Sequence, residues 1–257
     1  MAWKLLLPPA LARAALALCA LAAFPFLAWA EAVPLAPGSG LDLHQVVASA
    51  GQLDGQAGLR LVGEPSVLAE SAARRDAFLS TLKAPPTPAD FEAFETEHLA
   101  LVEGIEFSDG TIEVELAGAP APGAGRFARG FVGVAFRVQA GGAYDCFYLR
   151  PTNGRAPEQI RRNHSTQYIA HPDWPWHRLR AESPGQYESY ADMAPGQWIP
   201  VKIRVEGERA FLHVGGAEQP TLVVNDLKSG PEGKGQVALW IHGSSEGHFR
   251  NLRITPR

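Results

Sequence analysis

The sequence predicts an all-β domain made of two antiparallel sheets packed face to face. Residues 131–138 alternate large apolar side chains with Gly, Ala and Arg, and residues 201–206 alternate Val or Ile with charged residues. Because strand side chains point to opposite faces with a period of two, each run has one apolar face. Gly-rich turns separate such runs, and no helical period interrupts residues 197–256. This pattern is typical of an antiparallel sandwich.

Residues 1–30 are predicted to be an export signal. Lys4 and Arg13 give a positive start, an apolar run follows, and Ala28-Trp29-Ala30 fits the small-x-small cleavage rule. A proline lies within the apolar run, which argues against a retained membrane span. We therefore expect cleavage before Glu31, no stable membrane span afterwards, and a periplasmic or extracellular location.

The remaining chain is acidic and has one cysteine. Removing residues 1–30 takes two of 23 basic residues and none of 27 acidic ones, so the net charge falls from −4 to −6. Such a balance argues against a nucleic-acid partner held by phosphate contacts. Cys146 cannot form an internal disulfide and is predicted to be a buried hydrophobe. A Pro-, Ala- and Gly-rich linker over 31–40 and a single domain over 41–257 are expected.

The domain begins with weak strand signals over residues 41–62, of which 59–62 is the clearest. Residues 66–82 then carry apolar side chains at helical spacing and end at a proline-rich turn. A second short helical pattern covers 89–98. We expect a helical insertion over about 64–98 at the sandwich edge. The favoured interpretation is a surface excursion, and the alternative is a cap over a binding face.

From Leu99 onward the strand pattern dominates. The expected strands cover 99–102, 105–107, 111–116, 131–138, 143–150, 197–206, 209–214, 221–225, 235–242 and 247–255. Between Pro151 and Tyr190 lies a long segment dense in Arg, His, Tyr, Trp and Asn. Segments of that length in a compact domain are usually disordered or functional. Because this segment is too aromatic for disorder, we expect the functional site there.

Aromatic rings beside amide, hydroxyl and guanidinium groups suit a sugar, whose C–H face packs on a ring while its hydroxyls take hydrogen bonds. Arginine clusters also suit the carboxylate of a sugar acid. The predicted ligand-binding residues are Arg137, Tyr148, Arg150, Arg161, Trp176, Trp240 and His242. Tyr148 and Arg150 are two apart on a strand and share a face, as do Trp240 and His242. Trp174 and Trp176 could instead fold the loop onto the sandwich.

An enzyme is the alternative. His164 and Tyr168 are the predicted catalytic residues, as base and acid in a proton abstraction that an arginine assists. Glu113 and Glu115 share a strand face and could serve a hydrolase, although an ordinary exposed strand shows the same alternation.

No cofactor is predicted. The eight histidines are scattered without an HExxH spacing, so no metal site is expected. Structural Ca²⁺ through Asp109, Asn225 or Asp226 has no support from a loop with closely spaced oxygen ligands.

Four stretches resemble a known family. They are Phe107-Ser-Asp-Gly-Thr-Ile-Glu-Val-Glu115, Gly130-Phe-Val-Gly-Val-Ala-Phe-Arg137, Pro195-Gly-Gln-Trp198 and Gly247-His-Phe-Arg-Asn-Leu-Arg-Ile254. They are similar to concanavalin A-like lectin/glucanase domains, closest to the branch called domain of unknown function 1080, the 3-keto-disaccharide hydrolase domain. The resemblance covers about residues 99–256 and implies a jelly roll that carries its ligand on the concave sheet and its loops. The Glu-x-Asp-x-x-Glu strand of laminarinase-like glycosidases does not occur in this sequence.

Three hypotheses follow. The first is an exported jelly-roll domain that binds a carbohydrate or sugar acid on its concave face. The second is a sugar-active enzyme, either a keto-glycoside hydrolase or a uronic-acid lyase. The third is a structural or adhesive envelope domain, which large apolar exposure around Trp174 and Trp176 would favour. The fold alone does not separate them, because jelly rolls include both binders and catalysts.

Overall fold

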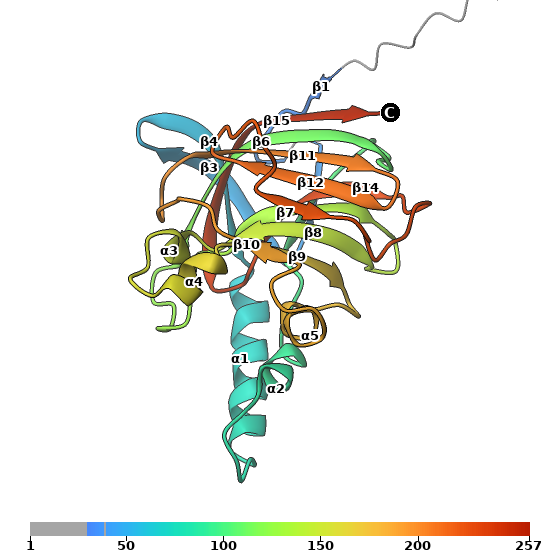
Figure 1. Cartoon of the computed structure of the whole chain (residues 1–257). Helices are drawn as coiled ribbons and strands as arrows, with labels where there is room; N and C mark the ends of the chain where they lie inside the picture. The colour runs from blue at the N-terminus through green and yellow to red at the C-terminus, as the bar shows by residue number, and fades with distance from the viewer. Residues whose placement is uncertain (1–29, 39) are drawn as a thin grey trace, which may run out of the picture.

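The computed structural model describes residues 30–38 and 40–257, so the predicted export signal lies outside the described residues except for Ala30. Within them the strands form two antiparallel sheets packed face to face (Figure 1). The predicted two-sheet jelly-roll sandwich with a helical insertion is confirmed. No helix among the described residues is long and apolar enough to span a membrane.

The sheets differ in size, and we call them the larger and the smaller sheet. The larger sheet has the order β13 (Leu222–Val224), β12 (Arg209–Val214), β11 (Ile199–Glu206), β6 (Gly110–Pro120), β15 (Ser245–Pro256), β4 (Gln56–Gly63) and β3 (Val46–Leu53), with β1 (Glu31–Ala32) paired to β15. The smaller sheet has the order β10 (Glu188–Ser189), β9 (Thr166–His171), β8 (Tyr144–Leu149), β7 (Val132–Val138), β14 (Gln236–Ile241), β5 (Leu99–Val102) and β2 (Leu41–His44).

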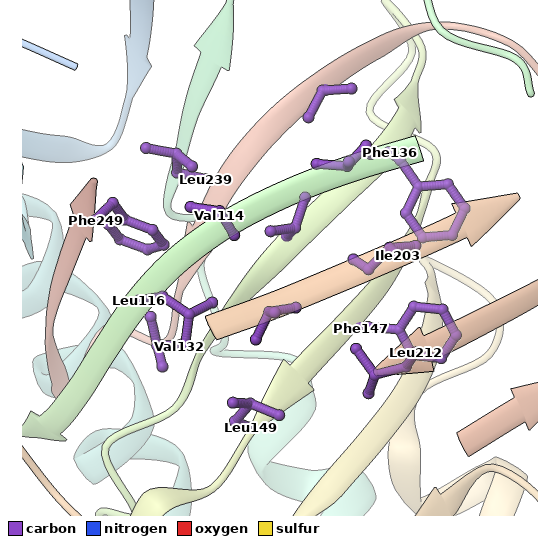
Figure 2. Packing of buried hydrophobic residues seen from close by; sticks show 14 of the residues in the cluster. Val114, Leu116, Val132, Phe136, Phe147, Leu149, Ile203, Leu212, Leu239 and Phe249 are labelled. Atoms are coloured by element: carbon purple, nitrogen blue, oxygen red, sulfur yellow. The ribbon is translucent and has the colours of Figure 1, made fainter. Parts of the chain in front are cut away.

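The core lies between the sheets and uses the alternation that the sequence shows. Val132, Val134 and Phe136 of β7 face inward and are fully buried. Ile203 of β11 meets them from the larger sheet (Figure 2). Burying a side chain of this size contributes about 1.5–3 kcal/mol, so these alternating runs supply much of the stability of the sandwich.

The outer face of the smaller sheet is also apolar. Its buried residues form a second cluster of Leu99, Ala135, Val138, Tyr144, Cys146, Tyr148, Ala238 and Trp240. Cys146 is fully buried, as predicted, and burial raises the pKa of its thiol well above the ordinary value. An apolar outer face is stable only when other elements shield it from water. The helices described next shield this face.

The helical insertion crosses from β4 of the larger sheet to β5 of the smaller one. It contains α1 (Pro65–Leu79) and α2 (Pro88–Glu92), with a capping box between Thr87 and Asp90 at the start of α2. The Phe78 and Phe94 rings, with centroids 5.2 Å apart, join α1 to the segment after α2. Both helices lie below the smaller sheet, beside α5 (Trp176–Glu182) (Figure 1). The insertion therefore resembles a cap more than a surface excursion.

Three sequence expectations need correction. Residues 31–35 are not a free linker, because β1 pairs with β15 and Val33 and Leu35 pack on the core. Residues 105–107 form no strand, and Phe107 makes only an isolated bridge to Gly235. The long segment 151–190 is largely regular, containing α3 (Pro151–Gly154), α4 (Gln159–Asn163), β9, α5 and β10.

A bulge in β7 changes the direction of Arg137. Ala238 pairs with Ala135 but Gln236 pairs with Val138, so β7 has one residue more than β14 here, and Arg137 has φ of 55°. The side chain turns away from Tyr148 to Asp109 and to loop carbonyls. Arg137, predicted to bind ligand together with Tyr148 and Arg150, therefore does not lie with them.

Candidate functional site

Two adjoining cavities form a cleft between the outer face of the smaller sheet and the helices. The smaller cavity, about 140 Å³, has Tyr144, Tyr148 and Trp240 in its wall, and we call it the aromatic end. The larger cavity, about 650 Å³, is the arginine end, and its lining includes Arg75, Arg129, Arg150 and Arg180. Both cavities are lined by Glu95, Phe131, Trp176 and His242. The cleft therefore joins a stacking surface to a cluster of positive charge.

Stacked rings make the floor of the aromatic end. Tyr148 of β8 and Trp240 of β14 lie with ring centroids 4.9 Å apart and planes at 27°. Phe131 meets Tyr148 edge-on at 5.8 Å, and His242 tilts against Phe131 at 5.0 Å. Trp240 donates from Nε1 to the Tyr144 hydroxyl at 3.3 Å. These contacts hold the rings in one orientation, as a preformed binding surface requires.

Three glutamates of the insertion bond to three histidines around the aromatic end. Glu92 bonds to His177, Glu95 to His242 with Oε2 3.2 Å from Nε2, and Glu97 to His171 with Oε1 3.3 Å from Nδ1. The Tyr144 hydroxyl also donates to Glu97. The insertion is thus attached to the smaller sheet and to α5 by carboxylate–imidazole pairs, and the same groups supply hydrogen-bonding atoms to the cavity wall.

The Glu95–His242 pair predicts a pH dependence. Burial is the largest single influence on the pKa of Glu95 and would raise it, but the charge and hydrogen bond of His242, together with the charges of His98 and His177, outweigh burial and lower the pKa below 4.5. Burial would likewise lower the pKa of His242, but the charge and hydrogen bond of Glu95, together with the charge of Glu97, raise it above 6.5. The histidine contribution is lost as pH rises through its raised pKa, and the glutamate contribution is lost as pH falls through its lowered pKa.

We therefore expect the docking of residues 88–97 to be tightest between pH 4.5 and 6.5, where both ordinary values leave the pair charged. Amide-exchange protection factors across that segment measure it. The effect is modest, because the side chains of Glu95 and His242 remain 48% and 31% exposed. His242→Gln should flatten the profile. An unchanged profile in that variant would show that other groups control the docking.

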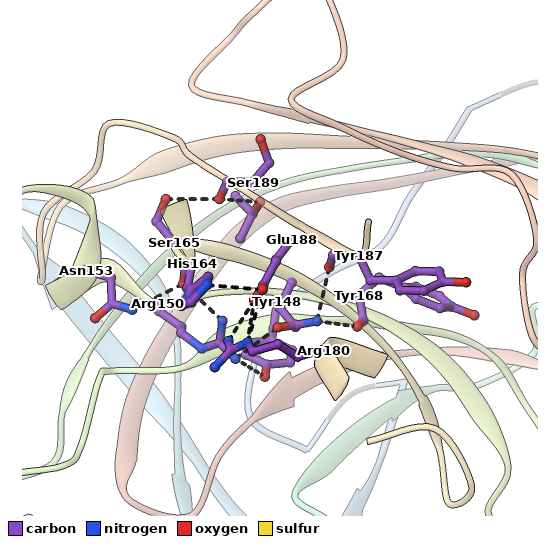
Figure 3. Close-up of polar contacts among 12 residues, drawn as sticks. Tyr148, Arg150, Asn153, His164, Ser165, Tyr168, Arg180, Tyr187, Glu188 and Ser189 are labelled. Carbon is purple, nitrogen blue, oxygen red and sulfur yellow. Dashed lines mark hydrogen bonds and ion pairs between the residues drawn. The ribbon is translucent and has the colours of Figure 1, made fainter. Parts of the chain in front are cut away.

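Arg150 and its neighbours form the polar network of the arginine end (Figure 3). Arg150 donates from Nη1 to the His164 carbonyl at 3.0 Å and from Nη2 to Tyr148 Oη at 2.8 Å and Gln167 Oε1 at 3.1 Å. Glu188 accepts hydrogen bonds from Arg180 Nε, at 3.0 and 3.2 Å to its two oxygens, and from Nη2 at 2.7 Å. His164 Nε2 lies 3.1 Å from the same carboxylate. Burial and the charge of Arg180 lower the pKa of His164, which favours its neutral form.

The structure brings six of the nine predicted residues to the cleft. They are Tyr148, Arg150, His164, Trp176, Trp240 and His242. Arg137 lies elsewhere, as described above. Arg161 pairs with Glu158 at 3.4 Å and lines neither cavity, because it lies on α4, beyond the cleft.

Tyr168 does not meet His164 in the cleft. In β9 the side chains alternate, so Gln167 points to Arg150 on the outer face and Tyr168 points into the core. The Tyr168 hydroxyl donates to the buried Asp145 and accepts from the Lys228 amide at 2.8 Å. The predicted His164–Tyr168 acid–base pair is therefore not assembled in this structure.

The other oxygen-bearing side chains considered for catalysis or for Ca²⁺ have protein partners. Glu115 lies on the larger sheet, where Arg250 Nε donates to it at 3.0 Å, which supports the structural interpretation of Glu113 and Glu115. Asp109 bonds to Arg137, Asp226 bonds to Tyr187 and Lys228, and Asn225 bonds to Arg209. Within the described chain no group of three or more His, Cys, Asp or Glu side chains is arranged to hold a metal ion.

Sequence reasoning missed several residues that line the cleft. They are Tyr144, Phe131, Arg129, Arg180 and the glutamates Glu92, Glu95 and Glu97. Tyr144 had a usable signal, since it shares the face of Cys146 and Tyr148 by alternation. No sequence signal marked the three glutamates, because the histidines that they pair with are distant in sequence.

No protein-family model matches the chain, and no curated protein is significantly similar to it. Solved structures with a similar fold include a carbohydrate-binding module from Bacillus subtilis, at 12% identity and TM-score 0.42 over 61% of this chain and 80% of that chain. A Bacillus subtilis protein of unknown function with a galectin-like fold is 12% identical, with TM-score 0.44 over 84% and 91%. The β-glucanase of Bacillus licheniformis is 13% identical, with TM-score 0.43 over 89% and 98%. Similarity at this level says nothing of function.

Proposed function

We propose that this protein is an exported carbohydrate-binding domain that holds a saccharide in the cleft between the smaller sheet and the helical insertion. The observation that carries the proposal is the half-buried Trp176 ring, which borders a cavity whose floor is made by the largely buried Tyr148 and Trp240 rings. A pyranose ring can pack its C–H face on an accessible indole such as that of Trp176. Carboxylate, imidazole and guanidinium groups of the same cleft can bind its hydroxyls.

The adhesive hypothesis was to be favoured by large apolar exposure around Trp174 and Trp176, and that exposure is not found. The large hydrophobic side chains that are strongly exposed in the described residues are Leu43, Val47, Phe91, Phe127, Ile160 and Tyr190. Trp174 and Trp176 are not among them, since Arg178 lies 3.8 Å from the Trp174 ring centroid and Arg180 lies 4.7 Å from that of Trp176. The enzyme hypothesis relied on His164 and Tyr168 as an acid–base pair, and these two side chains do not meet in the cleft.

The test is a saccharide screen that records both binding and product release. We expect binding without turnover, and we expect Trp176→Ala to weaken it about tenfold or more, as loss of a central aromatic contact does. Trp174→Ala is the matched control, because Trp174 lies just before α5, two residues from Trp176, but lines a different cavity. Its affinity should change less than about twofold, with folding checked by thermal unfolding.

Full affinity in Trp176→Ala would contradict the placement of the site. Release of new reducing ends or unsaturated sugars by the unmodified protein would make it an enzyme. In that case His164→Ala is the first variant to measure, because His164 is the predicted catalytic residue that the cleft retains.

A further inference from the structure

Two arginines at the arginine end carry charges that no carboxylate of the described residues pairs with. Arg150 is only 5% exposed, and its three hydrogen bonds go to a carbonyl, a phenol and an amide oxygen. Arg129 is half-buried and donates to the carbonyls of Arg126 at 2.9 Å and Ala128 at 3.1 Å. A buried charge without a counter-charge is unfavourable, so its retention needs a reason.

The fully buried Arg137 shows the contrast. Its Nη2 lies 3.2 Å from Asp109 Oδ1, so its charge is compensated within the protein. Near the cleft, Glu188 is already shared by Arg180 and His164, and Glu95, which lines the same cavity, pairs with His242. Burial lowers the pKa of Arg150, and burial with the nearby charges of Arg161 and Arg150 lowers that of Arg129. The arginine end therefore has an excess of positive charge.

The position of the Arg129 and Arg150 guanidinium groups suits the carboxylate of a sugar acid. The Arg150 guanidinium carbon lies 5.0 Å from the Tyr148 ring centroid and 5.9 Å from that of Trp176. Arg129 and Arg150 line the same cavity. A uronic acid carries its carboxylate directly on the pyranose ring, so a ring that packs on Trp176 can place the acid group near the two guanidinium groups that line the same cavity. A planar guanidinium binds a planar carboxylate through two parallel hydrogen bonds.

We propose that the arginine end of the cleft binds the carboxylate of an acidic saccharide, with Arg129 and Arg150 as its counter-charges. The inference rests on the proposed carbohydrate site and adds the class of ligand. Binding of the acid removes the charge imbalance that the free protein holds, so affinity depends on the carboxylate and decreases with salt.

The experiment compares oligouronates with the same oligosaccharides after reduction of their carboxyl groups to alcohols, by calorimetric titration of the purified protein. The probes are oligomers that contain galacturonate, mannuronate or glucuronate. We expect the acid form of at least one to bind about tenfold tighter or more than its reduced form, which is the fold-change that one charge-assisted hydrogen bond supplies. Arg129→Ala should weaken binding of the acid form much more than binding of the reduced form, so that the ratio of the two affinities falls toward one.

Arg126→Ala is the matched control, because Arg126 lies on the same loop, stacks on Phe127 and does not line the cavity. It should bind both forms as the unmodified protein does. If Arg129→Ala fails to fold, Arg150→Gln provides the same comparison. Equal binding of acid and reduced forms overturns this inference and leaves the proposed function standing. Binding confined to sulfated saccharides overturns the carboxylate assignment, and no saccharide binding overturns both proposals.

Discussion

Arg137→Met is expected to lower the free energy of unfolding by about 3–5 kcal/mol. The guanidinium is fully buried and bonds to Asp109 and to the carbonyls of Ser108, Gly207 and Gly230. Removing it takes this donor from the three carbonyls and the counter-charge from the half-buried Asp109, which is the unfavourable part of breaking such a network. Urea unfolding followed by fluorescence measures the change.

The destabilisation caused by Arg137→Met is to be compared with that caused by Arg150→Met. Arg150 is also buried, but it has no carboxylate partner in the described residues. Its loss removes an uncompensated charge together with the hydrogen bonds, so we expect a destabilisation at least about 2 kcal/mol smaller than that of Arg137→Met. Equal destabilisation would indicate that Arg150 has a structural role, and would remove the energetic argument for an anion at the arginine end.

Tyr168→Phe is expected to destabilise the protein by about 2 kcal/mol at pH 7 while leaving saccharide affinity unchanged. Its hydroxyl donates to Asp145, which is fully buried, and the Lys228 amide loses its acceptor when the hydroxyl is removed. Tyr168 therefore contributes to the core and not to chemistry in the cleft. Denaturant unfolding and calorimetric titration of one preparation test both parts.

The destabilisation by Tyr168→Phe should also depend on pH. Burial raises the pKa of Asp145 above 3.8. As pH falls through that raised value the carboxyl becomes neutral, and the bond from Tyr168 weakens with it. We therefore expect a smaller destabilisation near pH 4 than at pH 7. Tyr187→Phe is the control, since its hydroxyl bonds to the half-exposed Asp226. A loss of sugar binding or turnover in Tyr168→Phe with normal stability would restore its catalytic assignment.

The strands were predictable wherever one face was apolar and the turns were Gly-rich. Residues 199–206 and 209–214 pair as the expected hairpin, with Val205 opposite Ala210. Strand β9 was missed because each of its faces mixes polar and apolar residues, with Thr166 beside Tyr168 on the inner face and Gln167 beside Ile169 on the outer face, so no apolar face marks it. The bulge at Arg137 was missed because alternation assumes an unbroken register.

The sequence by itself determined the sandwich, the position of the helical insertion and the face shared by Tyr148 and Arg150, because these follow from local periodicity. Only the tertiary structure decided which of the marked residues meet. It separated His164 from Tyr168, removed Arg137 from the cleft, and brought the glutamates at 92, 95 and 97 to histidines far along the chain. It also showed that Arg150 is buried and has no carboxylate partner among the described residues. Pairing across sheets and loops depends on long-range packing, which periodicity does not encode.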